Sequence, residues 1–280
     1  MSTPHPAPTD PGMRLLRRSP DKRPRVRRGV ALLPSLFTMG NMFCGYSCII
    51  YSLRGDFESA APYIGISIVL DMLDGRIARL TGTSSEFGVQ LDSLADAISF
   101  GVAPAILAYA WGLAPLGRLG MFSGFLFVSG AVLRLARFNV QSAGGGDKRY
   151  FVGMPSPAAA GVLAATVYLF SDGLTDYRPS LAALAMVLVP ALLMVSTIRF
   201  RSFKTLDLQM RRPYTVLFLV AAGLMAVATH PRIVLVAMAY TYLASAFIGM
   251  GLARVRHRGQ PPAATVSVPA PEPAPDAAQP

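Results

Sequence analysis

Long apolar stretches recur along this 280-residue chain, and they constrain its fold more than any other feature of the sequence. Each is close to the length of roughly 20 residues that a helix needs to cross the hydrocarbon of a bilayer. A spanning segment must satisfy its backbone hydrogen bonds internally, so these stretches predict helices. They cover residues 30–53, 59–80, 91–113, 117–138, 155–171, 179–198, 213–229 and 232–252. The expected fold is an all-α, polytopic transmembrane helical bundle of about eight spans.

The composition agrees with a membrane protein. Only 15% of the residues are charged and the mean hydropathy is +0.45, which is unusual for a soluble domain. The flanking segments differ: residues 1–28 are rich in Pro and Arg, and residues 254–280 are rich in Pro and Ala. Such compositions bury too little apolar surface to fold, so both segments are predicted to be disordered tails around a membrane domain at 29–253.

The basic residues predict the orientation in the membrane. If the N-terminus is cytoplasmic, only Arg54, Arg118, Arg178 and Arg232 of the 26 Lys and Arg residues fall on the outer side. The other 22 face the cytoplasm, which follows the positive-inside rule with both termini inside. Positive charge beside anionic lipid accounts for the pI of about 10.2. A nucleic-acid partner is not expected, because the sequence has no basic soluble domain.

The two cysteines, Cys44 and Cys48, lie four residues apart in the first apolar stretch and share a helical face. A metal or redox role would need further ligands nearby, and the surrounding sequence has none. We therefore expect both thiols to pack as small apolar groups.

Residues 71–96, DMLDGRIARLTGTSSEFGVQLDSLAD, place four aspartates where the second and third stretches meet. Asp71 and Asp74 are three residues apart and share one face of the second helix. Asp92 and Asp96 are four apart and share one face of the third. The predicted topology puts both helix ends at the cytoplasmic surface, so the two pairs are expected to face each other there.

Four converging carboxylates are costly near a bilayer. One aspartate at the centre of a membrane helix costs about 2.5–3.5 kcal/mol on insertion scales, and neighbouring carboxylates also repel one another. A cation among them would offset both penalties. Oxygen ligands alone suit Mg²⁺, Mn²⁺ or Ca²⁺, whereas the lack of nearby His or Cys argues against zinc.

The aspartates have two other possible interpretations. They could form structural ion pairs with Arg76 and Arg79, but two arginines do not neutralise four carboxylates and Glu86. They could instead form the ion pathway of a cation transporter. That function would favour acidic residues dispersed at mid-membrane over several helices, and the other stretches hold almost none.

The spacing of this segment resembles the signature of the CDP-alcohol phosphotransferase family at eight fixed positions. These are Asp71, Asp74, Gly75, Ala78, Arg79, Gly88, Asp92 and Asp96. Four flanking segments are similar to the membrane-embedded bacterial phosphatidylserine synthases of that family. They read PSLFTMGNMFCGY, TGTSSEFGVQLDSLADAISFGVAP, LRLARFNV and FVGMPSPAAAG, and the resemblance extends over roughly residues 30–200.

The resemblance implies transfer of a phosphatidyl group from CDP-diacylglycerol to the hydroxyl of L-serine, with release of CMP. It implies that all four aspartates bind two divalent ions, Mg²⁺ or Mn²⁺ with Ca²⁺ as a further option, and that Asp96 is also the general base. It further implies a homodimer in the bacterial inner membrane, with its active site facing the cytoplasm. The nucleotide and its diphosphate are expected to lie against Gly75, Ala78, Arg79 and Gly88.

Other polar residues are weaker candidates. Asn41 is expected either to contact the nucleotide or to form a helix–helix hydrogen bond. A second group is expected to bind serine or phosphate, or to line the site: Arg134, Arg137, Asn139, Ser85 and Glu86. Arg134 and Arg137 could instead serve topology or lipid headgroups. A different acceptor alcohol, such as glycerol 3-phosphate or inositol phosphate, stays open, because these basic residues could also bind a phosphorylated acceptor.

Overall fold

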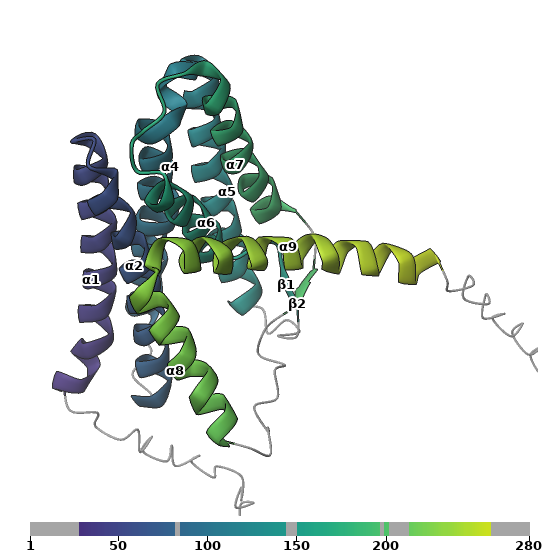
Figure 1. Ribbon diagram of the computed structural model, residues 1–280. Helices are drawn as coiled ribbons and strands as arrows, with labels where there is room; N and C mark the ends of the chain where they lie inside the picture. The colour runs from purple at the N-terminus through teal and green to yellow at the C-terminus, as the bar shows by residue number, and fades with distance from the viewer. Residues whose placement is uncertain (1–27, 82–84, 144–149, 197–198, 202–212, 259–280) are drawn as a thin grey trace, which may run out of the picture.

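A computed structural model describes residues 28–81, 85–143, 150–196, 199–201 and 213–258 of the chain (Figure 1). The greater part of both predicted tails lies outside these residues. The boundary predicted at residue 254 falls within the last helix, which continues to Arg258.

Each of the eight apolar stretches coincides with a helical segment. The first four are α1 (Arg28–Leu53), α2 (Phe57–Thr81), the rod that starts at α3 (Glu86–Asp96), and α5 (Arg118–Ala143). The others are α6 (Ser156–Leu169), α7 (Tyr177–Val195), α8 (Pro213–Thr229) and α9 (Pro231–Arg258). The rod continues from α3 through η1 (Ala97–Val102), α4 (Ala103–Ala108), η2 (Tyr109–Leu113) and η3 (Ala114–Leu116).

The helical fold class is confirmed, but the number of spans is only partly supported. Among the described residues, four segments are long and apolar enough to cross a membrane. These are Ser35–Leu53, Glu86–Leu116, Arg118–Gln141 and Tyr177–Val195. Helix α6 is apolar but has only 14 residues, and α2 carries the charges of the aspartate motif.

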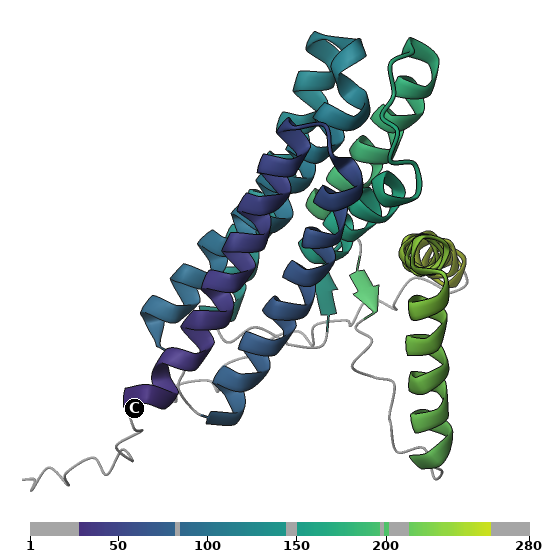
Figure 2. The same cartoon turned by 60° about the vertical axis from the view of Figure 1, so that its left-hand side comes forward.

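The core is built around α6. This helix is apolar on all sides and is enclosed by α2, α4, α7 and α9, as expected for a helix without a polar face. Ala159, Ala160 and Leu163 are fully buried in it. Figure 2 shows α1 and α2 running side by side in opposite directions, and they pack along much of their length. Cys44 and Cys48 are buried free thiols on the inner side of α1, in agreement with the predicted packing role.

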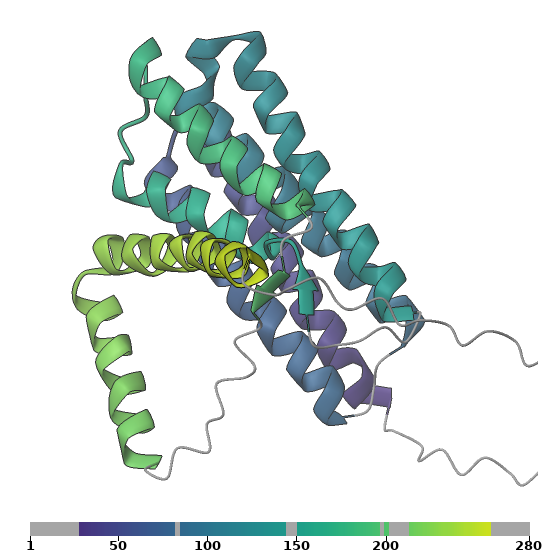
Figure 3. The same cartoon turned by 90° about the vertical axis from the view of Figure 1, so that its right-hand side faces the viewer.

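Two features were not predicted. A short antiparallel pair joins β1 (Tyr150–Val152) to β2 (Arg199–Arg201), linking the chain before α6 to the chain after α7 (Figure 3). Helix α9 runs across the bundle instead of along it, and it packs mainly on α6 (Figure 1). Hydropathy reports the length of an apolar helix and not its direction, so the sequence could not distinguish this arrangement from a parallel span.

The close approach of α5 to the preceding segment makes a prediction about stability. A Cβ atom added at Gly120 would lie 2.1 Å from the backbone oxygen of Leu113, and neither backbone can move away freely. We expect Gly120→Ala to cost about 1–3 kcal/mol, as overpacked sites do. The measurement is the midpoint of thermal unfolding in detergent, followed by size-exclusion chromatography.

Gly223 in α8 is the matched control, because a Cβ atom there would meet no atom within 4 Å. Gly223→Ala is therefore expected to keep or slightly raise the parent midpoint, because alanine is the better helix former. Equal midpoints for the two variants would contradict the packing described for α5.

Candidate metal and substrate site

Three carboxylates converge where α2 and α3 meet. One oxygen each from Asp71, Asp74 and Asp92 lies within 4.8 Å of the others. Asp71 and Asp74 project from one face of α2, and Asp92 projects from the facing side of α3. Helical spacing thus brings together three of the four aspartates singled out in the sequence.

Two oxygens of this cluster have no partner among the described residues. Asp74 Oδ2 accepts a hydrogen bond of 3.1 Å from Thr38 Oγ1, but the buried Asp74 Oδ1 and Asp92 Oδ1 accept none. An unpaired buried carboxylate oxygen is strongly unfavourable, so this geometry suits a ligand that supplies positive charge. A hard divalent cation fits three carboxylates at this separation.

Arginine ion pairs do not account for the cluster. In the part of the chain that the structure describes, no arginine lies within 4.0 Å of these carboxylates as an ion pair. Arg76 and Arg79 are both exposed at the end of α2. The interpretation of the aspartates as structural ion pairs with these two residues is therefore not supported.

Asp96 lies outside the three-carboxylate cluster and has a different partner. Asn41 Nδ2 donates a hydrogen bond of 3.1 Å to Asp96 Oδ1. Asn41 is fully buried in α1, and its side-chain oxygen accepts a hydrogen bond from Ser67 of α2. Its amide therefore forms the helix–helix hydrogen bonds that the sequence offered as one alternative.

Sequence reasoning missed Thr38 and Ser67. Both signals were present in the helical spacing: Ser67 lies four residues before Asp71, and Thr38 lies three before Asn41. Small polar residues on the face of a membrane helix that carries a functional side chain are candidates for hydrogen bonds between helices.

The two candidate arginines occupy different environments. The guanidinium of Arg134 donates a 2.8 Å hydrogen bond to the buried Ser156 and interacts electrostatically with Asp96 and Asp71. Arg137 points to the end of α7, where it donates a 3.4 Å hydrogen bond to the backbone oxygen of Val195. Arg134 is thus the arginine that shares the site with the aspartates.

Asn139 contacts a residue beside the cluster and not the cluster itself. Its Nδ2 donates a 2.9 Å hydrogen bond to Ser93 Oγ, which joins α5 to α3 one residue after Asp92. The structure thus places Asn139 as a link between helices.

The expected nucleotide residues differ in their surroundings. Gly75 borders open space, since a Cβ atom there would meet nothing within 4 Å, while Ala78 is partly buried one turn later. Ser85 caps α3 by accepting a 3.0 Å hydrogen bond from the Gly88 amide, and a Cβ atom at Gly88 would crowd the Ser85 hydroxyl at 3.1 Å. Glu86 is exposed in the first turn of α3.

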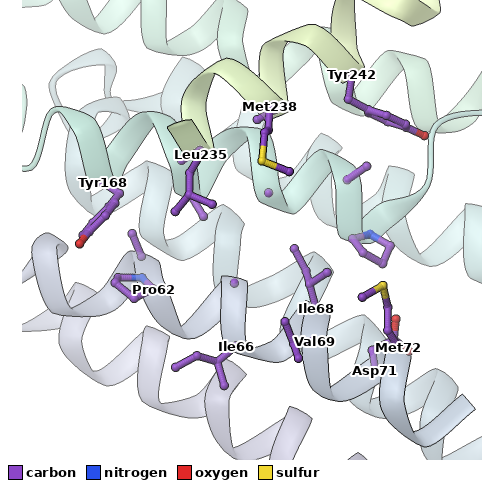
Figure 4. Close-up of a pocket in the computed structure, with 18 of the residues that line it drawn as sticks. Pro62, Ile66, Ile68, Val69, Asp71, Met72, Tyr168, Leu235, Met238 and Tyr242 are labelled. Carbon is purple, nitrogen blue, oxygen red and sulfur yellow. The ribbon is translucent and has the colours of Figure 1, made fainter. Parts of the chain in front are cut away.

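An apolar groove of about 820 Å³ opens beside the cluster, between α2, α6 and α9. Figure 4 shows Pro62 and Tyr168 toward one end of it, and Asp71 and Tyr242 toward the other. Asp71 is the one charged residue among the described residues that line the groove. The aspartate therefore joins an apolar space to the polar cluster.

Comparison with known proteins identifies the part of the chain that carries these features. A family model described as CDP-alcohol phosphatidyltransferase matches residues 31–197. The chain is similar to a CDP-diacylglycerol–serine O-phosphatidyltransferase of Helicobacter pylori, with 42% identity over 178 residues. That alignment covers 62% of this chain and 73% of the relative.

More distant relatives match over a similar part of the chain. A CDP-diacylglycerol–serine O-phosphatidyltransferase of Bacillus subtilis is 34% identical, over 61% of this chain and 91% of the relative. An archaetidylserine synthase of Methanothermobacter thermautotrophicus is 38% identical, over 60% of this chain and 69% of the relative.

The unpartnered oxygens predict weaker cation binding when one is removed. Asp92→Asn keeps the shape of the side chain but removes its charge. We expect the Kd for Mn²⁺ to rise about tenfold or more, equivalent to ~1.4 kcal/mol. Electron paramagnetic resonance of Mn²⁺ titrated into purified protein measures the free ion directly.

Asp172→Asn is the control, because Asp172 is exposed in the connection between α6 and α7. It is expected to bind Mn²⁺ as the parent does. Unchanged affinity in Asp92→Asn would show that the cluster does not hold the cation.

Proposed function

This chain belongs to the CDP-alcohol phosphatidyltransferase family, and on that premise we propose that it is a CDP-diacylglycerol–serine O-phosphatidyltransferase. It transfers the phosphatidyl group of CDP-diacylglycerol to the hydroxyl of L-serine and releases CMP. The observation that carries the proposal is the three-carboxylate cluster with two unpartnered oxygens, at one end of an apolar groove. CDP-diacylglycerol has acyl chains, which need an apolar space, and a diphosphate, which needs a cation site.

The aspartates would hold the cofactor. Asp71, Asp74 and Asp92 supply oxygen ligands from two helices, and family resemblance adds Asp96 and a second ion. Mg²⁺ or Mn²⁺, and also Ca²⁺, suit such ligands. When bound, divalent ions neutralise the diphosphate and stabilise the charge that develops as the phosphoryl group transfers.

Asp96 is the proposed general base. The hydroxyl of serine is a poor nucleophile at neutral pH, and a positioned carboxylate within hydrogen-bond reach can take its proton. One Asp96 oxygen accepts the hydrogen bond from Asn41, so the carboxylate has a second oxygen for the substrate. The serine oxygen then forms a bond to the lipid-linked phosphorus, the bond to CMP breaks, and Asp96 carries the proton.

Arg134 is the proposed partner of the serine carboxylate. Its guanidinium is anchored on Ser156 and lies in the field of Asp96 and Asp71, close to where the acceptor reacts. An arginine offers two parallel donors to a carboxylate, which orients the amino acid as well as holding it. Arg137 is directed to α7 and does not share this position.

The nucleotide is proposed to lie against the cytoplasmic end of α2. Gly75 leaves open space where the substrate can approach the backbone, and the exposed Arg79 is available to the diphosphate. Ala78 and Gly88 complete the small-residue surface that the family signature implies. Ser85 and Glu86 lie at the start of α3, where they border the same region.

The diacylglycerol is proposed to occupy the groove between α2, α6 and α9. Its volume of about 820 Å³ lies within the range of roughly 300–1,000 Å³ that is typical of ligand pockets. Its lining is apolar except at the Asp71 end. The acyl chains would enter from the bilayer while the headgroup reaches the aspartates.

We also propose the finer topology that the basic residues predict. The protein would have eight spans in the inner membrane of a bacterium, with both termini and the aspartates on the cytoplasmic side, as 22 of its 26 basic residues indicate. This topology requires α9, which lies across the bundle in Figure 1, to turn along it in a bilayer. Family resemblance supports a homodimer.

The choice of acceptor gives the most direct test. Purified protein in detergent receives CDP-diacylglycerol, Mn²⁺ and one acceptor at a time, and CMP release is measured. We expect release with L-serine and little with glycerol 3-phosphate, inositol phosphate or no acceptor. Asp96→Asn is expected to lower the serine-dependent rate at least about 10²-fold, the scale of general-base catalysis.

Other outcomes of this assay would indicate a different function for this protein. Release that favours glycerol 3-phosphate or inositol phosphate would indicate a sister enzyme with another alcohol. No release with any acceptor would contradict an enzyme of this class and favour the cation transporter.

The roles of the two arginines can be distinguished by how their substitution changes the KM for serine. Arg134→Lys keeps the charge but loses the paired donors, so the KM for serine is expected to rise about tenfold or more. Arg137→Lys is expected to change it less than about twofold, because this residue binds the end of α7. Steady-state kinetics with varied serine measures both values. The reverse pattern would assign serine binding to Arg137.

A further inference from the structure

A buried hydrogen-bond network surrounds Asn41 and joins three helical segments. The side chain is fully buried in α1, and both ends of its amide are engaged. Nδ2 donates to Asp96 Oδ1 at 3.1 Å, and Oδ1 accepts from the hydroxyl of Ser67 in α2. The residue thus connects α2 to the end of α3 through one side-chain amide.

Asp96 and Ser67 together hold this amide from its two ends. An ionised carboxylate only accepts hydrogen bonds, so the NH₂ group of Asn41 has to face Asp96. The hydroxyl of Ser67 lies at the opposite end, within hydrogen-bonding distance of the amide oxygen and also 3.2 Å from the backbone oxygen of Asn41. A flipped amide would set its oxygen against the Asp96 carboxylate, two acceptors in contact. Removing the Ser67 hydroxyl leaves the amide oxygen without its donor, so the Asn41 side chain is held at one end only.

Ser99 binds the backbone of the same residue, as Ser67 also does, but it does not bind the side chain. Its hydroxyl donates a 3.0 Å hydrogen bond to the backbone oxygen of Asn41 and does not bind the amide. It lies in η1, the π-helical segment that begins directly after Asp96. A Cβ atom at Gly45 would lie 2.6 Å from the Ser99 hydroxyl, so α1 packs closely on η1. This contact holds the helices together without orienting the side chain of Asn41.

The network determines where the Asp96 carboxylate lies. Asp96 follows Asp92 by one helical turn, but it is not a member of the group whose oxygens lie within 4.8 Å of one another. The hydrogen bond from Asn41 holds it on the side of α1 instead. Asp92 and Asp96 therefore lie on one helical face with different hydrogen-bond partners, while Asp96 still interacts electrostatically with Asp71 and Asp92.

We propose that Asn41 is a positioning residue that directs the Asp96 carboxylate to the acceptor hydroxyl, and that Ser67 fixes the Asn41 amide for this purpose. The inference rests on the proposed function, because it concerns the group that takes the proton from the acceptor. Asn41 binds one oxygen of Asp96 and limits rotation of the carboxylate. The other oxygen keeps the orientation that proton transfer needs.

Ser67→Ala and Ser99→Ala form a matched pair for testing this proposal. Each change removes one buried hydroxyl that donates to Asn41, but only Ser67 binds the amide. We expect Ser67→Ala to lower kcat about tenfold or more, since a small misplacement of a reacting group can cost as much as ~10²-fold. The KM values for serine and CDP-diacylglycerol should change less than about twofold, as a defect confined to the reacting geometry predicts.

Ser99→Ala provides the structural control. It is expected to shift the thermal midpoint to a similar extent as Ser67→Ala but to keep kcat. Both variants should bind Mn²⁺ with the affinity of the parent protein. The serine pair is preferred to Asn41→Asp, because that change adds a buried charge beside Asp96 and tests folding at the same time.

Three results would overturn the inference. Ser67→Ala could keep the parent kcat, the two variants could lose kcat equally, or Ser67→Ala could lose Mn²⁺ affinity in step with kcat. The second result would indicate a shared packing defect, and the third a role in the cation cluster. Failure of the parent protein to release CMP with serine would instead contradict the proposed function, so the two failures are distinguishable.

Discussion

Mutual repulsion of carboxylates at a membrane boundary is the constraint on which the rest of this structure depends. Asp71, Asp74 and Asp92 approach within 4.8 Å, in surroundings that solvate charge poorly. The protein offsets only part of that cost: Thr38 donates to one oxygen of Asp74, and Arg134 contributes positive charge from α5. Two buried oxygens remain without partners in the described chain. Such buried oxygens suit a cation that would complete the site, and the proposed diphosphate substrate would require the same cation.

The arrangement of the helices connects this polar centre to the lipid phase. Helix α2 carries Asp71 and Asp74 on its C-terminal half, and an earlier part of the same helix lines the apolar groove. Helices α6 and α9 close the groove on its other sides (Figure 4). Asp71 belongs to both spaces, so a lipid headgroup can reach the cluster while its chains stay in apolar surroundings. This continuity explains why the aspartates lie at the end of a membrane helix.

Local sequence patterns predicted the helices and much of the aspartate site. Helical spacing alone placed the aspartates on facing surfaces, and hydropathy located all eight helical segments. What could not be predicted depends on contacts between distant segments. The direction of α9, the β1–β2 pair and the hydrogen bond from Ser67 to Asn41 join residues far apart in the chain. The same holds for the two arginines, since only the packing of α5 on α6 and α7 distinguishes Arg134 from Arg137.

The central claim is that the cation held by the aspartate cluster is required for transfer of the phosphatidyl group to serine. Incorporation of labelled serine into lipid, measured against the free Mn²⁺ concentration in chelator-treated protein, tests it most directly. The account predicts no labelled lipid in the chelated protein, with activity restored in parallel with occupancy of the Mn²⁺ site. Full incorporation of serine at negligible free divalent cation would contradict it and leave the cluster with a structural role only.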